Sequence, residues 1–286
     1  MNRLQALIIT SHPGPSLAIT ALTTLLAAQA APHGIGPVLT APSLLAQQLS
    51  IGWSNDACDA ARDTAAGRPD KPIARGDIGV GAVWTAAGAA AAAGLAMAFA
   101  IGPLTGALFA LMAVLGWAYN LGLKSSLTSG ALYLLGFGLL PAYAASTLPG
   151  EPAPRWPITV AAALLGLGAH FANVLPDLTD DARNGVRGLP QRIAARFGPV
   201  ATRSAALALL LAASVLLLVA ASPGRRWVAV AGLCCSVVLA VAGARGRGKV
   251  PFLAAIGIAG VNAALFAGGV ETLTALAAPH LAGALG

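Results

Sequence analysis

Residues 78–101, with the sequence IGVGAVWTAAGAAAAAGLAMAFAI, contain no charged side chain and consist almost entirely of small and apolar residues. A helix needs about 20 consecutive apolar residues to cross the hydrocarbon core of a bilayer, and this stretch is long enough. The rest of the chain has the same character, because 57% of its 286 residues are hydrophobic, 9% are charged and the mean hydropathy is +0.77. An ordinary soluble domain is about one quarter charged. The composition therefore indicates an integral membrane protein.

Eight further apolar stretches predict eight more spanning helices. The nine expected spans are residues 15–31, 35–53, 78–101, 104–121, 128–147, 157–175, 201–221, 227–242 and 252–267. The chain contains 34 Gly, and small residues let helices pack closely in lipid. No linker long enough to separate two soluble domains interrupts the series. We therefore expect one all-α membrane domain over residues 1–286.

The basic residues lie between the apolar stretches and are unevenly distributed. If the N-terminus is cytoplasmic, 14 of the 17 Lys and Arg residues fall on the cytoplasmic side, and the others are Arg155, Arg225 and Arg226. By the positive-inside rule, we expect an integral protein of the cell (inner) membrane with a cytoplasmic N-terminus. The net charge of +7 does not indicate nucleic-acid binding, because the basic residues form no stripe with interleaved aromatic residues.

The acidic residues are concentrated in two short patches, each at the expected cytoplasmic end of a helix. Eight of the ten belong to them: Asp56, Asp59, Asp63, Asp70 and Asp77 in the first, and Asp177, Asp180 and Asp181 in the second. Carboxylates in or near the membrane are costly and usually mark function. The patches are therefore the candidate site.

Both patches share the spacing Asn-x-x-x-Asp-x-x-x-Asp. The residues are Asn55, Asp59 and Asp63 in the first patch, and Asn173, Asp177 and Asp181 in the second. Residues four apart share one face of a helix, so we expect two helices that each present a row of oxygen ligands. Carboxylates this close repel one another, and hard oxygen ligands without a His/Cys set favour Mg²⁺. Two such rows could hold a diphosphate between metal ions.

An alternative interpretation makes the acids a solvated loop face that pairs with neighbouring arginines. The candidate partners are Arg62, Arg68, Arg183 and Arg187. The matched spacing of both patches on one side of the membrane favours the shared site over this alternative.

Several segments resemble those of one known family. Residues 55–63, NDACDAARD, are similar to the first aspartate motif of the UbiA superfamily of intramembrane prenyltransferases, and residues 177–181, DLTDD, are similar to its second. The basic, proline-bearing stretches at 67–76 and 185–190 resemble those that follow the two motifs. Residues 119–124, YNLGLK, resemble the Tyr/Lys segment between the fourth and fifth helices.

This resemblance implies a fold, a cofactor and a substrate. The fold would be a ring of about nine transmembrane helices around a central cavity, capped on the cytoplasmic side by the loops after helices two and six. The cofactor would be Mg²⁺ and the substrate an isoprenoid diphosphate. The implied metal ligands and catalytic groups are Asp56, Asp59, Asp63, Asp177 and Asp181, helped by Asn55, and the implied phosphate contacts are Arg68, Lys71, Lys124 and Arg187.

Five further residues lie near the motifs, and all but Asn173 have two interpretations each. Asn173 begins the second row, and Tyr119 and Asn120 either line the site or pack between helices. His170, one helical turn before Asn173, is either a hydrogen-bonded core residue or a group that orients an acceptor. His12, at the start of the first span, either lines the cytoplasmic mouth or caps the helix at the membrane interface, and we favour the cap.

The leading functional hypothesis is transfer of a prenyl group from an isoprenoid diphosphate to a lipophilic acceptor of aromatic or quinone type, with membrane lipids as surroundings. An alternative keeps the ionisation step but closes the cation on itself, as an intramembrane terpene cyclase does. A second alternative is a cation or lipid transporter. Transport sites are expected near the bilayer midplane, whereas both motifs lie at helix ends, which disfavours this alternative.

Overall fold

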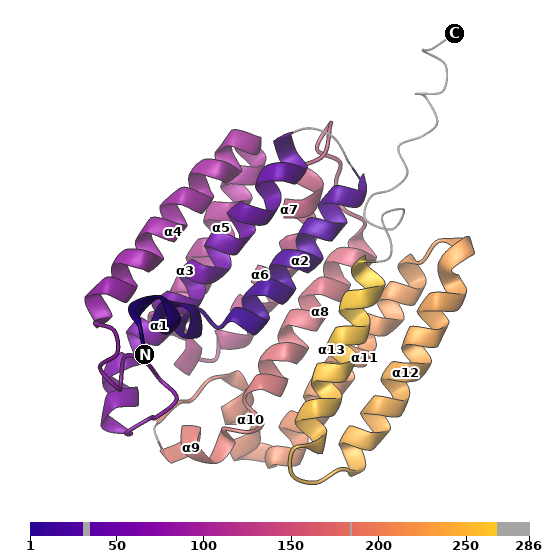
Figure 1. Ribbon diagram of the computed structural model, residues 1–286. Coiled ribbons are helices and arrows are strands. Elements are labelled where there is room, and N and C mark those ends of the chain that lie inside the picture. The colour runs from indigo at the N-terminus through magenta and orange to yellow at the C-terminus, as the bar shows by residue number, and fades with distance from the viewer. Residues whose placement is uncertain (31–34, 184, 268–286) are drawn as a thin grey trace.

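The computed structural model describes residues 1–30, 35–183 and 185–267, and this part of the chain is all-α (Figure 1). The α-helices are α1 Arg3–Thr10, α2 Pro13–Ala30, α3 Ile35–Ala65, α4 Val80–Ile101, α5 Pro103–Asn120, α6 Ser129–Gly138, α7 Leu140–Ser146, α8 Trp156–Asn173, α9 Leu178–Arg183, α10 Leu189–Phe197, α11 Pro199–Ala220, α12 Arg226–Arg245 and α13 Val250–Ala267. Two short 3₁₀ turns, η1 Leu123–Ser125 and η2 Pro223–Arg225, join neighbouring helices.

Each expected span coincides with a helix, or with the pair α6 and α7 for the span 128–147, and residue 31 of the first span lies outside the described residues. Within the described residues, five segments are long and apolar enough by themselves to cross a membrane: 80–101, 103–120, 129–146, 199–220 and 223–245. The predicted all-α membrane fold is therefore confirmed, while the count of nine spans stays a prediction.

The long helices lie alongside one another, and the bundle closes on itself (Figure 1). Helix α3 packs mainly on α4, α8 on α11, and α12 on α13, while α13 also contacts α2. Glycine permits the closest approaches: a Cβ on Gly94 of α4 would lie 2.6 Å from the Phe109 ring of α5. Buried polar side chains also join helices, since the Ser214 hydroxyl of α11 donates to Asn262 Oδ1 of α13 at 2.6 Å.

Helix α3 is long enough to carry the first aspartate motif out of the membrane. Its 31 residues span about 46 Å at 1.5 Å per residue, whereas the hydrocarbon core is about 30 Å thick. The excess of about 16 Å corresponds to about eleven residues, the length of the segment from Asn55 to Ala65. The span that the sequence predicts to end at residue 53 therefore continues as the same helix through the motif.

The second motif does not lie on one helix, so the predicted helical row of Asn173, Asp177 and Asp181 is wrong. Helix α8 ends at Asn173, and α9 begins at Leu178. Pro176 explains the break, because proline has no N–H and disfavours the helical conformation of the residue before it. The chain turns instead, with hydrogen bonds from Leu175 N to Ala172 O and from Asp177 N to Val174 O, both 3.1 Å.

The two segments that follow the motifs lie at the same end of the bundle. Figure 1 places the α3–α4 connection there together with α9 and α10. Ser129, at the start of α6, links the second segment to the bundle, since its hydroxyl accepts a hydrogen bond from Leu189 N at 2.8 Å and contacts His170 Nε2 at 3.2 Å. This end of the bundle carries the candidate site.

Candidate active site

The first motif occupies the last three turns of α3, as its spacing predicts. Asp56 and Asp63 are buried, with 3% and 5% of their surface exposed, and Asp59 is 13% exposed. The alternative of a solvated loop face is partly realised, because Arg62 pairs with Asp59 at 2.8 Å and Arg183 with Asp180 at 3.5 Å. It does not explain why two carboxylates are buried.

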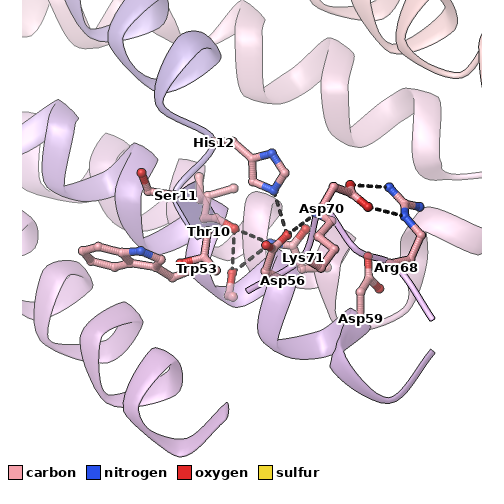
Figure 2. Close-up of polar contacts among 12 residues, drawn as sticks. Thr10, Ser11, His12, Trp53, Asp56, Asp59, Arg68, Asp70 and Lys71 are labelled. Carbon is pink, nitrogen blue, oxygen red and sulfur yellow. Dashed lines mark hydrogen bonds and ion pairs between the residues drawn. The ribbon is translucent and has the colours of Figure 1, made fainter. Parts of the chain in front are cut away.

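Asp56 contacts two nitrogen atoms through one oxygen. His12 Nε2 lies 2.8 Å and Lys71 Nζ 2.7 Å from Asp56 Oδ1 (Figure 2). Burial alone would raise the pKa of Asp56, but these hydrogen bonds and charges outweigh it and hold the pKa below its ordinary value. The carboxylate thus stays ionised, and it ties the α1–α2 turn and the α3–α4 connection to α3.

The α1–α2 turn approaches α3 closely at this point. A Cβ on Gly52 would lie 2.4 Å from the carbonyl oxygen of Ser11, so a larger residue would push the turn away. Trp53 Nε1 donates to Leu7 O at 2.8 Å. The backbone of His12 has φ 52°, a left-handed conformation that is uncommon outside glycine. These contacts fix the α1–α2 turn against α3 in a position from which His12 contacts Asp56.

Asp59 connects the first motif to the segment between α5 and α6. It accepts a hydrogen bond from Lys124 Nζ in η1, in addition to the ion pair with Arg62. A Cβ on Gly188 would lie 2.6 Å from the Lys124 carbonyl oxygen, so the stretch that follows the second motif lies directly on the Lys124 backbone. Three connecting segments therefore converge on the end of α3.

The second motif lies at the same end of the bundle as the first (Figure 1). Asp181 accepts from Gln191 Nε2 at 2.8 Å, and burial raises its pKa, with a further contribution from the charge of Asp177. The charge of Arg62, from the first motif, acts in the opposite direction on Asp181. The pKa of Asp181 is therefore affected by charges from both motifs.

Arg68 lies within reach of both motifs. Its guanidinium group donates to both carboxylate oxygens of Asp70, at 3.0 and 2.9 Å (Figure 2). These hydrogen bonds are the main reason why the pKa of Arg68 is raised, and the charges of Asp63 and Asp177 also contribute. Arg68 thus neutralises one carboxylate of its own loop and lies in the field of one carboxylate from each motif.

Burial raises the pKa of Asp63, and the negative charge of Asp59 adds to this effect. Asp63 forms no ion pair within the part of the chain that the structure describes. Within the same residues, no three His, Cys, Asp or Glu side chains already surround a single point as metal ligands would. Carboxylate oxygens without His/Cys partners nevertheless suit a hard divalent cation. The donor chemistry fits Mg²⁺, and the basic side chains now offset part of the negative charge.

The other candidate residues differ in their positions. Tyr119 packs edge-on against Tyr133 and His170, with ring centroids 5.1 and 5.8 Å apart, and it lies in the field of both Asp59 and Asp181. Asn173, Asp177 and Arg187 are exposed, Asn55 is half-buried, and the Arg187 carbonyl accepts from Arg192 Nε at 2.7 Å.

His170 is a core residue, in agreement with the first of its two interpretations. It is 1% exposed, stacks on Tyr133 with centroids 4.4 Å apart and contacts Ser129 Oγ. Asn120 packs between helices, because its amide donates to Ile51 O at 2.9 Å and Ser54 Oγ at 2.8 Å.

Sequence reasoning missed one residue that touches the motifs, Gln191, and it favoured the less informative interpretation of His12. The side chain of His12 contacts the buried Asp56, which agrees with the alternative that His12 lines the mouth of the site. A histidine at the start of the first span, on the same side as the motifs, was the available signal. No comparable signal distinguishes Gln191 from other polar residues of its segment.

Residues 16–251 match the model of the UbiA prenyltransferase family. The chain belongs to the UbiA prenyltransferase family. Comparison with curated protein sequences gave no match.

Solved structures of UbiA homologues have the same fold. A UbiA homologue from Archaeoglobus fulgidus bound to GPP and Mg²⁺ superimposes with a TM-score of 0.72 and 16% identity, covering 93% of this chain and 99% of that chain. The apo UbiA homologue from Aeropyrum pernix K1 gives 0.69 and 17%, covering 93% and 98%. A structure concerning digeranylgeranylglyceryl phosphate synthase gives 0.71 and 14%, covering 94% and 99%. At these identities the likeness shows the UbiA fold.

Proposed function

We propose that this protein is a Mg²⁺-dependent intramembrane prenyltransferase, which transfers the prenyl group of an isoprenoid diphosphate to a lipophilic acceptor of aromatic or quinone type. The observation that carries the proposal is that the segments of both aspartate motifs lie at one end of the bundle (Figure 1), where Lys71 and Lys124 contact the carboxylates of the first motif. Structures of the Archaeoglobus fulgidus homologue bound to DMAPP and Mg²⁺ and to GPP and Mg²⁺ support it by analogy.

The metal ligands in this proposal are Asp56, Asp59, Asp63, Asp177 and Asp181, with amide oxygens from Asn55 and Asn173. Bound Mg²⁺ would supply positive charge to the diphosphate and so make it a better leaving group. Without such a cation, the burial that raises the pKa values of Asp63 and Asp181 is unfavourable for their ionised forms. A divalent cation would reverse this effect and keep both groups ionised.

In this proposal the basic residues pair either with the carboxylates of the motifs or with the phosphate oxygens of the substrate. Lys71 and Lys124 now donate to Asp56 and Asp59. When these carboxylates bind metal, both ammonium groups can turn to the phosphate oxygens, together with Arg68 and Arg187. Positive charge would then lie where negative charge develops on the departing diphosphate, which lowers the barrier to ionisation.

The chemical step would break the allylic C–O bond, with the electron pair leaving on the diphosphate. A carbon atom of the acceptor then attacks the allylic cation, and loss of a proton from that carbon restores the ring. Tyr119, Tyr133 and His170 form an aromatic group, and His170 lies in the last turn of α8, which ends at Asn173. Aromatic faces attract cations, and an apolar, water-poor surrounding protects the cation from hydrolysis.

The test is to compare diphosphate release and product formation by the parent protein with those of Asp59→Asn and Asp177→Asn. Purified protein would receive prenyl diphosphates of several lengths, with and without phenolic and quinonoid acceptors, and the products would be identified by mass spectrometry. Glu151→Gln is the matched control, because it removes the same charge far from both motifs. Release at the parent rate by both motif variants would overturn the proposal.

The same products separate this proposal from its alternatives. A cyclic hydrocarbon or alcohol formed without an acceptor would indicate a terpene cyclase. No turnover, together with ion or lipid flux in proteoliposomes that both Asn variants abolish, would indicate a transporter. We further propose that the N-terminus and the site face the cytoplasm, which reporter fusions at residue 1 would test.

A further inference from the structure

A cavity lies beside the second aspartate motif, at the same end of the bundle. It is a cavity of about 220 Å³ between three segments: the turn after α8, the first turns of α11, and the α12–α13 connection with the start of α13. Two of its lining residues, Pro176 and Leu178, flank Asp177 in the chain, but Asp177 does not line the cavity. The cavity is therefore separate from the carboxylates of the candidate active site.

Among the residues that the structure describes, the ionisable ones that line this cavity are both basic, Arg203 and Lys249. Neither of them forms an ion pair with any residue that the structure describes. The Arg203 side chain has one weak hydrogen bond, from Nη1 to Gly246 O at 3.3 Å. Its Nε is buried and has no hydrogen-bond partner in the described residues. A buried charged donor without an acceptor is unfavourable, so the cavity is suited to an anion.

The part of the chain that carries Arg203 and Lys249 contains no carboxylate to fill that role, and the nearby Asp177 does not line the cavity. Between Arg183 and Val270 the sequence contains ten Lys or Arg residues and no Asp or Glu. Eight of these basic residues lie in α9 and α10, at the start of α11 or around the α12–α13 connection, all at this end of the bundle: Arg183, Arg187, Arg192, Arg196, Arg203, Arg245, Arg247 and Lys249. The acceptor for Arg203 must therefore come from outside this part of the protein.

The rest of the lining and its surroundings are apolar, which favours an anion that also carries apolar chains. Leu178, Val200 and Phe252 line the cavity beside the two basic residues. On the adjoining surface, Phe197 is 69% and Leu253 59% exposed. Since the cavity lies at the ends of α11 and α13, a membrane around these helices would place it near the lipid headgroups. A charged pocket beside exposed apolar side chains matches a ligand with both a phosphate and acyl chains.

We propose that this cavity binds the headgroup phosphate of an anionic phospholipid, with Arg203 and Lys249 as its ligands. Basic pockets between transmembrane helices are known to recognise such headgroups. The site would anchor the turn that positions Asp177, because that turn forms one wall of the cavity. The proposal does not depend on the reaction that the aspartate motifs catalyse.

The test is lipid binding by the full-length protein, measured by native mass spectrometry and by thermal unfolding in detergent. The probes are phosphatidylglycerol, phosphatidylcholine with the same acyl chains, and inorganic phosphate. Lys249 is exposed, so Lys249→Gln is expected to fold normally, and it should weaken phosphatidylglycerol binding about fivefold. Adding Arg203→Gln should weaken binding about 25-fold, if the two charges act independently. Arg225→Gln with Arg226→Gln removes two charges at the opposite end and is the control.

The expected result is that phosphatidylglycerol binds to the parent and the control, raises the unfolding midpoint of both, and does so much less for the Lys249→Gln variant. Equal binding of phosphatidylcholine, or unchanged phosphatidylglycerol binding by Lys249→Gln, would overturn the proposal. Stabilisation by inorganic phosphate but not by phosphatidylglycerol would also overturn it, and would assign the cavity to a free anion.

Discussion

Gly52→Ala should disconnect His12 from the first aspartate motif without touching any charged residue. The new methyl group would lie 2.4 Å from the Ser11 carbonyl oxygen, whereas ordinary van der Waals contact begins at 3.4 Å. The α1–α2 turn must therefore move by roughly 1 Å to restore a normal contact. A shift of this size lengthens the 2.8 Å contact between His12 Nε2 and Asp56 Oδ1 beyond hydrogen-bonding distance.

The cost of this change follows from two terms. Loss of a hydrogen bond to a charged group costs about 1.5–3 kcal/mol, and overpacking at a close backbone contact costs about 1–3 kcal/mol. Part of this free-energy cost will be offset, because Lys71 keeps its hydrogen bond to Asp56 Oδ1. We therefore expect a loss of roughly 2–4 kcal/mol in the free energy of unfolding. The half-saturating Mg²⁺ concentration for diphosphate release should change as well, because the orientation of Asp56 is no longer fixed.

The assay combines thermal unfolding in detergent with Mg²⁺ titrations of diphosphate release. Gly88→Ala is the control, because it adds the same methyl group to α4 where no atom lies within 4 Å. Adding His12→Asn to Gly52→Ala should change the unfolding midpoint little further, because the shifted turn has already broken the contact between His12 and Asp56. If Gly52→Ala matches Gly88→Ala in both the unfolding midpoint and the Mg²⁺ titration, His12 has no role in positioning Asp56.

Three further perturbations test the rest of the site. Gly188→Ala should lower activity several-fold, because its methyl group would lie 2.6 Å from the Lys124 carbonyl oxygen and displace the segment that follows the second motif; steady-state kinetics would measure it. Ser129→Ala should lower the free energy of unfolding by about 1–3 kcal/mol, because it leaves Leu189 N without its acceptor; thermal unfolding would measure it. Burial raises the pKa of Asp63, so the folded protein binds this proton more tightly than the unfolded chain does. The metal-free protein should therefore become more stable as the pH falls from neutral through the raised pKa towards the ordinary value of 3.8. Asp63→Asn should remove this part of the pH dependence.

Each of these perturbations has a matched comparison. Gly81→Ala meets no atom within 4 Å and should leave activity unchanged, so equal kinetics for the Gly81 and Gly188 variants would contradict the close contact. Ser126→Ala changes an exposed turn hydroxyl and should cost less than Ser129→Ala. Asp70→Asn removes an exposed carboxylate whose pKa is already low, about 2. It should leave the rise in stability from neutral pH unchanged, and a pH profile that Asp63→Asn does not alter would contradict the burial argument.

The sequence predicted the membrane fold and the position of the first motif because both depend on local patterns. Charge-free stretches of sufficient length define membrane helices, and a four-residue spacing without proline continues the helix past Trp53 to Asp63. The second motif has the same spacing, but Pro176 interrupts the backbone hydrogen bonds, so side-chain periodicity alone gave the wrong geometry. The rule that the residue before a proline leaves the helix would have corrected this.

The contacts that join distant segments could not be read from local patterns. His12 reaches Asp56 across 44 positions of the chain, and Lys124 reaches Asp59 across 65. Both depend on how α2, α3 and α5 pack. The resemblance to the UbiA superfamily indicated Lys124 but not His12, since the resembling segments begin at residue 55. The placement of Arg187 on the surface likewise depends on the course of the chain after α9.

The contact between α2 and α13 has a consequence for how the protein is made. Helix α2 leaves the ribosome among the first segments of the chain, whereas α13 is synthesised more than 200 residues later. During translation, one flank of α2 must therefore face lipid or the insertion machinery. A nascent chain that stops before Val250 has every residue of both aspartate motifs, yet it lacks the helix that packs between α2 and α12 in the finished protein.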